Sequence, residues 1–175
     1  KSFRVVTSIF LIILFTSCLS SKKIRINQPT ANISGIKFLG EYHIPFALNY
    51  NNTTVGGLSG IDYDAQNNNY YLICDDRSSI NPARFYTANL SITKNRIDTI
   101  RFTGMSYLLQ PNDKTYPNYK QDRYHTTDPE AIRYDPLTKQ LSWSSEGERV
   151  IKEKDTVLTD PSIRIMKPDG KFADS

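Results

Sequence analysis

Two segments of this chain repeat one pattern at an offset of 71 residues, and no gap is needed to align them. The stretch "LSGIDYDAQNNNYYLICDD" begins at Leu58, and "PEAIRYDPLTKQLSWSSEG" begins at Pro129. Matched pairs follow at the same spacing: Ser59 with Glu130, Ile61 with Ile132, Tyr63 with Tyr134, and Asp75 with Glu146. An internal repeat of this kind indicates that the chain builds one structural unit at least twice.

The repeated unit has the composition and alternation of strands separated by turns, and no segment after the N-terminal apolar run has the period of an amphipathic helix. The predicted elements of the first unit are a strand over 34–44, a hairpin over 60–76 with its turn in the Asn-rich 65–69, and strands over 83–92 and 95–104. Those of the second unit are a hairpin of 129–135 with 139–146 and a third strand over 161–170. The predicted fold class is all-β.

Repeated four-stranded antiparallel meanders are the unit of a β-propeller. We therefore predict a β-propeller fragment of about two blades over residues 33–175, with the second blade lacking its outer strand. Because the sequence starts at Lys1 and stops after "KPDGKFADS", we expect it to be the N-terminal part of a longer propeller domain. A β-sandwich built from the same strands is the alternative. Residues 105–127 lack periodicity and are expected to be an insertion over one mouth or a variable surface loop.

The net charge of +4 does not indicate a nucleic-acid partner. Lys1 and Arg4 supply two of the positive charges, and without residues 1–17 the net charge is +2. The rest of the chain has no run of basic residues interleaved with aromatic residues, so nucleic-acid binding is excluded.

Residues 1–17 have the pattern of a secretory signal peptide, because two basic residues precede the short apolar run "VVTSIFLIILF". The following "LFTSC" resembles a bacterial lipoprotein cleavage box, although Phe15 replaces the preferred Leu. We expect Cys18 to be lipidated, residues 18–32 to be a tether, and the protein to be exported and anchored to the bacterial envelope at the outer membrane. A plain signal peptide with an incidental cysteine is the alternative. Cys74, within "YYLIC", is predicted to be a buried thiol.

The repeat also brings acidic residues together. If the second hairpin turns near Thr138, Glu130 lies opposite Glu146 and Asp128 lies opposite Glu148. Like charges that face each other across a sheet repel one another unless a cation compensates.

If the first hairpin turns near Asn67, Ser59 lies opposite Asp75, with Asp76 beside it. Equivalent ends of successive blades line one mouth of a propeller, so the acids of the two hairpins are expected to converge. Carboxylate oxygens suit calcium better than a transition metal, and two histidines without a cysteine cluster make zinc improbable.

A calcium cluster would suit a phosphorylated small molecule, because it neutralises phosphate and lowers the pKa of a bound water. Arg77 and Arg84 are candidates for phosphate contacts, and Arg133 and Arg149 lie close in sequence to the acids of the second hairpin. The alternative is that these arginines pair with the same acids and lock the strands together without a metal.

A serine nucleophile is disfavoured. "GLSGI" at 57–61 has Ile61 where the motif G-x-S-x-G needs a glycine, and a strand continues where that motif needs a helix.

Four stretches together resemble the phytase-like family, described as having the esterase-like activity of phytase: "GGLSGIDYD", "YYLICDDR", "ARFYTANL" and "DPEAIRYD…LSWSSEGER". The resemblance covers about residues 34–172. It implies an exported propeller and a relation to calcium-dependent phytases, whose calcium ions are held by acids at the propeller mouth. On matching positions it implies Asp75, Asp76, Glu130 and Glu146 as metal ligands.

The resulting hypothesis is a lipid-anchored, calcium-dependent phosphoesterase that hydrolyses phosphomonoesters by metal-activated water, with no covalent intermediate. Arg77 and Arg84 would contact phosphate. The alternative is a non-catalytic propeller that binds a glycan, a peptide or an envelope partner, since fold alone does not decide function.

Overall fold

The computed structural model describes residues 33–38, 40–94, 96–154 and 156–173. These residues form eleven strands and no helix, so the all-β prediction is confirmed. Accordingly, this part of the chain contains no helix that could cross a membrane. The predicted signal peptide (1–17), the lipidation site Cys18 and the tether (18–32) lie outside the described residues.

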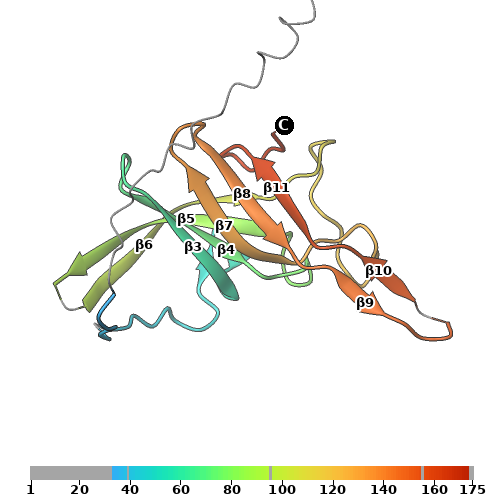
Figure 1. The fold of residues 1–175 in the computed structure, drawn as a ribbon, viewed down its shortest axis with the longest axis horizontal. Coiled ribbons are helices and arrows are strands. Elements are labelled where there is room, and N and C mark those ends of the chain that lie inside the picture. Colours follow the sequence, from blue (N-terminus) through green and yellow to red (C-terminus); the bar gives the residue numbers. More distant parts are fainter. Residues whose placement is uncertain (1–32, 39, 95, 155, 174–175) are drawn as a thin grey trace, which may run out of the picture. The chain divides into compact units, whose positions relative to one another are not determined.

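Most strands belong to two antiparallel sheets within the compact unit Phe38–Ser175 (Figure 1). The first sheet has the order β3–β4–β5–β6, formed by Leu58–Asp64, Asn69–Cys74, Arg84–Thr93 and Arg96–Tyr107. The second has the order β11–β8–β7, formed by Ser162–Met166, Gln140–Ser145 and Pro129–Asp135. Both follow the predicted meanders. Neither sheet closes on itself, so the propeller stays a prediction.

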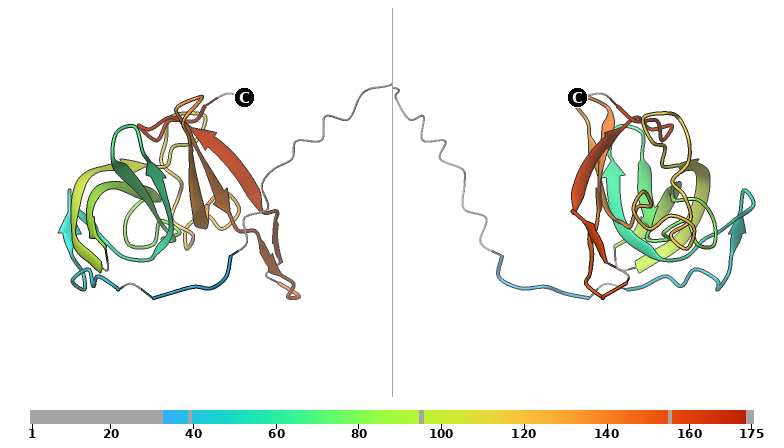
Figure 2. Two further views of the ribbon diagram at one scale, coloured as in Figure 1. Left: turned by 60° about the vertical axis from the view of Figure 1, so that its left-hand side comes forward. Right: turned by 90° about the vertical axis from the view of Figure 1, so that its right-hand side faces the viewer.

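Two short hairpins have no signal in the sequence pattern, because strands of two or three residues are too short to show alternation. They are β1–β2, formed by Asn49–Tyr50 and Thr53–Thr54, and β9–β10, formed by Glu148–Val150 and Val157–Thr159. The β9–β10 hairpin extends away from the second sheet (Figures 1 and 2).

The predicted strand over 34–44 is wrong, because the described residues 34–38 and 40–44 belong to no strand. The alternation of apolar residues there finds no partner strand, and Phe38 remains 76% exposed. Ile44 instead packs against a small cluster that contains Val55, Cys74 and Tyr86. Cys74 is buried, as predicted.

The sequence repeat is preserved in three dimensions at the same offset. Each hairpin skips one residue in its register, and the skipped residues are Ser59 in β3 and Glu130 in β7. Each hairpin turn also ends on a residue with left-handed backbone geometry, Asn68 in the first and Lys139 in the second. The gap-free alignment therefore reports a shared backbone path, including the irregularities.

The core lies between the two sheets. Tyr71, Ile73 and Phe85 of the first sheet pack against residues of the second sheet, namely Ile132, Leu141, Trp143 and Met166. The connection after β6 adds Leu108 and Tyr116 to this cluster. Residues 105–107 belong to β6, and the segment after them contributes to the core, so it is not purely a surface loop; an insertion over one mouth of a propeller stays a prediction.

Strands β3 and β7 run side by side in the same direction. The backbone N–H of Tyr134 donates a 2.6 Å hydrogen bond to Asp62 Oδ2, and a Cβ on Gly60 would lie 3.0 Å from the Cα of Ala131. The contacting residues are 71 or 72 positions apart in the sequence at both places, so the two strands are parallel. The absence of a side chain at Gly60 permits the close approach.

We predict that Gly60→Ala destabilises the protein by about 1–2 kcal/mol, because the new methyl group must displace the β7 backbone or Ile73. The matched control is Gly56→Ala, where no atom lies within 4 Å of the added carbon. We expect that control to be neutral or slightly stabilising. Urea unfolding of both variants measures the difference, and equal stabilities would contradict the role of Gly60.

Candidate functional site

Three acidic side chains meet at one end of the β7–β8 hairpin. Asp128 precedes β7, Glu130 lies at the skipped position within β7, and Glu146 follows β8. One carboxylate oxygen from each residue lies within 4.8 Å of the others. Two oxygens bound to one calcium ion at about 2.4 Å are at most about 4.8 Å apart. The three carboxylates therefore have the spacing that a shared divalent cation requires.

The local backbone explains why these side chains converge. The bulge at Glu130 disturbs the alternation of β7, a feature that commonly redirects a side chain near functional sites. Pairing then continues beyond the strands, because the N–H of Glu146 donates a 2.9 Å hydrogen bond to the carbonyl of Asp128. The buried Ser145 hydroxyl accepts hydrogen bonds from Asp128 N–H and from Thr127 Oγ1, which fixes the start of β7.

The acidic charges are not fully compensated. Burial, followed by the charges of Glu146, Asp128 and Asp75, raises the pKa of Glu130. Burial also raises the pKa of Asp128, although Arg77 opposes this effect. Among the described residues neither Glu130 nor Glu146 forms an ion pair. The cluster is thus electrostatically unfavourable without a cation.

A fourth acid beside the cluster differs, because two arginines neutralise it. Glu148 pairs with Arg123 and with Arg77, whose Nη2 lies 2.8 Å from its Oε2. These partners lower the pKa of Glu148, with Arg123 having the larger effect. Arg77 also lies with its Nε 3.6 Å from Asp128 Oδ2 and with its guanidinium over the Tyr119 ring. The predicted phosphate contact Arg77 thus borders the cluster while already paired.

Asp75 comes to the same place from the first sheet. Its charge raises the pKa of both Asp128 and Glu130. Its backbone N–H donates to the carbonyl of Gly57, as that of Glu146 does to Asp128. Among the described residues, the Asp75 carboxylate has no hydrogen-bond or ion-pair partner.

Asp76 and Arg84, in contrast, are engaged with each other. Arg84 Nη1 lies 2.9 Å from Asp76 Oδ2, and the two side chains are 1% and 7% exposed. Asp76 also accepts hydrogen bonds from the backbone N–H groups of the loop that follows, those of Ser79, Ile80 and Asn81. This arrangement matches the interpretation in which an arginine locks strands together, and it keeps both residues away from the acidic cluster.

The cluster contains Asp128, which the sequence hypothesis did not include among the metal ligands. Two features of the sequence could have identified Asp128 as part of the cluster: it directly precedes Pro129, and it lies at the acidic end of the predicted hairpin. The predicted pairings of Glu130 with Glu146 and of Asp128 with Glu148 are wrong, because the bulge leaves Glu130 without a partner in the register. Asp128 instead lies opposite Glu146, and Glu148 continues into β9. Ser59, which occupies the position equivalent to Glu130, is exposed and brings no carboxylate.

The described residues form an all-β fold with an acidic cluster at one end of a hairpin, and a comparison with protein families identifies the class. A family model described as "Phytase-like: Esterase-like activity of phytase" matches residues 53–175. The chain therefore belongs to the phytase-like family. No curated protein and no solved structure matches it.

We predict that Glu130→Gln stabilises the metal-free protein by about 0.5 kcal/mol at neutral pH, because it removes repulsion within the cluster. Since the pKa of Glu130 is raised in the folded protein, the native state binds more protons than the unfolded state above pH about 4. Stability therefore falls as pH rises through the raised pKa, and this component should be absent in the variant. Urea unfolding in chelator across pH 4–7 tests it; a less stable variant at neutral pH would contradict it.

We further predict that Arg84→Ala lowers the free energy of unfolding by about 3–5 kcal/mol, because it leaves the buried Asp76 carboxylate without its cation. The matched control is Arg133→Ala, which breaks an exposed pair with Asp62 and should cost about 0–1 kcal/mol. Similar losses in the two variants would refute a structural role for the buried pair.

Proposed function

We propose that this chain is part of a calcium-dependent phosphoesterase whose metal is held by Asp128, Glu130 and Glu146, with Asp75 beside them. One observation carries the proposal: three carboxylates lie within the reach of one cation, and two of them have no ion-pair partner among the described residues. Oxygen-only ligands favour calcium over a softer metal. Membership of a family described by an esterase-like activity supports hydrolysis of an ester.

Each residue contributes in a definite way. A cation held there would offset the charge of a phosphate group and make a water more acidic. Asp128, Glu130 and Glu146 would hold that cation, and Asp75 would accept a hydrogen bond or proton from a group beside it. Arg77 would help to orient the phosphate, since its guanidinium already lies at the edge of the cluster.

We propose that the two sheets are successive blades of a propeller. The support is that the second sheet packs on the first, with the equivalent strands β3 and β7 parallel and adjacent. Export and anchoring through lipid on Cys18 are part of the same proposal, and the sequence pattern of residues 1–18 supports them.

We predict that the mature full-length protein releases phosphate from phosphomonoesters in calcium and not in excess chelator. Glu130→Gln should lower this release by about 100-fold or more, because it removes a charged ligand. Glu153→Gln is the matched control, since Glu153 is an exposed acid near the β9–β10 tip. If folded protein releases no phosphate under either condition, the non-catalytic binding propeller is favoured instead.

A direct binding measurement complements the assay. Calcium should raise the melting temperature of the wild type and of Glu153→Gln, because a ligand that binds only the native state stabilises it. The increase should be much smaller in Glu130→Gln and Glu146→Gln. Equal shifts in all four proteins would exclude the cluster as the calcium site.

A further inference from the structure

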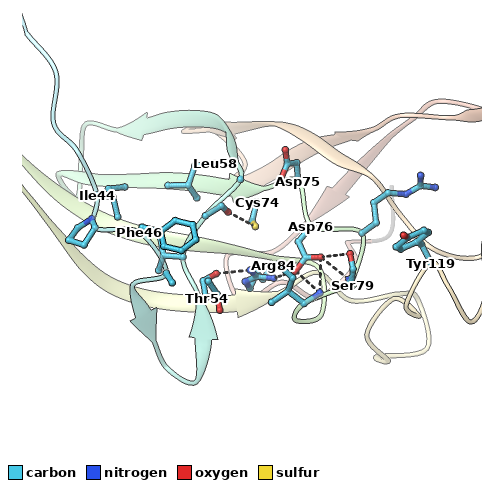
Figure 3. A pocket seen from close by; sticks show the side chains of 17 residues that line it. Ile44, Phe46, Thr54, Leu58, Cys74, Asp75, Asp76, Ser79, Arg84 and Tyr119 are labelled. Atoms are coloured by element: carbon cyan, nitrogen blue, oxygen red, sulfur yellow. Dashed lines mark hydrogen bonds and ion pairs between the residues drawn. The ribbon is translucent and has the colours of Figure 1, made fainter.

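A cavity of about 810 Å³ lies beside the acidic cluster, between residues 44–47, the start of β3 and the loop that follows β4. Figure 3 shows its side chains. Its size is within the range of small-molecule sites. Nothing in the proposed chemistry of the acids accounts for it.

One end of the cavity is apolar. Ile44, Phe46 and Leu58 group together there (Figure 3), and Ile80 also lines the space. Phe46 is fully exposed and Ile80 is 71% exposed. Large apolar side chains held in water around a concave surface are characteristic of a binding site, because covering them by an apolar ligand is favourable.

The other end adjoins the acidic cluster through Asp75. Asp75 lines the cavity, and so does Arg77, whose Nε lies 3.6 Å from Asp128 Oδ2 of the cluster. Gly57 has a φ of 56°, and a Cβ at this position would lie 1.9 Å from Asp75 Oδ1. The side chain of Asp75 therefore occupies space that only a glycine leaves open, and it forms a wall common to the cavity and the cluster.

The charges of the lining disfavour a polyanionic ligand. Arg84 is engaged by the buried Asp76, and Arg77 pairs with Glu148. The remaining lining charge at the cluster end is the carboxylate of Asp75. This carboxylate repels an anionic group but does not repel an uncharged apolar group.

We propose that this cavity binds the apolar organic group of the substrate, an aryl group, while the phosphate ester lies at the acidic cluster. The inference rests on the proposed function and specifies its substrate class. Phe46 and Ile80 are then specificity-determining residues that contact the organic group and take no part in the chemistry.

The test compares 1-naphthyl phosphate with methyl phosphate in calcium, using Phe46→Ala and Ile80→Ala. Each substitution should raise KM for 1-naphthyl phosphate by about tenfold, since it removes apolar contact, and leave kcat and the KM for methyl phosphate unchanged. The control is Leu137→Ala. Leu137 is 92% exposed and lies in the β7–β8 turn, at the opposite end of the hairpin from the acids.

The outcomes separate the two proposals. If both esters are hydrolysed and the cavity variants affect them equally, the cavity proposal fails and the phosphoesterase stands. If folded protein hydrolyses neither ester, the proposed function fails, and fluorescence titration with 1-naphthol decides the cavity alone. Weaker 1-naphthol binding in Phe46→Ala and Ile80→Ala than in Leu137→Ala supports the apolar site, whereas equal binding in all variants overturns it.

Discussion

The close approach of β7 to β3 is the contact on which the rest of the structure depends. It requires Gly60 on one strand, and the hydrogen bond from Tyr134 N–H to Asp62 fixes the relative position of the two strands. Because Asp75 follows β4 beside the start of β3, and Asp128 and Glu130 lie at the start of β7, this parallel contact places the acids of the two sheets at the same end. With the sheets further apart, Asp75 would be separated from the cluster of Asp128, Glu130 and Glu146.

A second constraint orients the loop between β4 and β5. Asp76 points inward to the buried Arg84, which also donates a 2.7 Å hydrogen bond to the carbonyl of Thr54. Its two neighbours in sequence, Asp75 and Arg77, are left to face the surface beside the acids. The buried Asp76–Arg84 pair thus fixes the positions of the Asp75 carboxylate and the Arg77 guanidinium, although neither group belongs to the pair.

The sequence predicts the strands and the sheet order well, because alternation and turn residues act locally and the repeat confirms them. It places Glu130 and Glu146 at the same end of one hairpin, although not in the observed register. It gives Asp75 and Asp76 the same role, whereas the structure pairs Asp76 with the buried Arg84, because adjacent aspartates in "DD" look alike until burial separates them. Asp128 escapes the ligand set because a bulge changes which residues face one another, and no composition signal marks that bulge. The strand expected over 34–44 fails since alternation does not reveal whether a partner strand exists.

The stacking of the sheets gives equivalent positions of the repeat different surroundings. Ile132 is 1% exposed against the first sheet, whereas its counterpart Ile61 is 48% exposed. A polar substitution would be tolerated at Ile61 in this chain and would disrupt the core at Ile132. Two copies with the same backbone therefore differ in mutational tolerance within the described part of the chain.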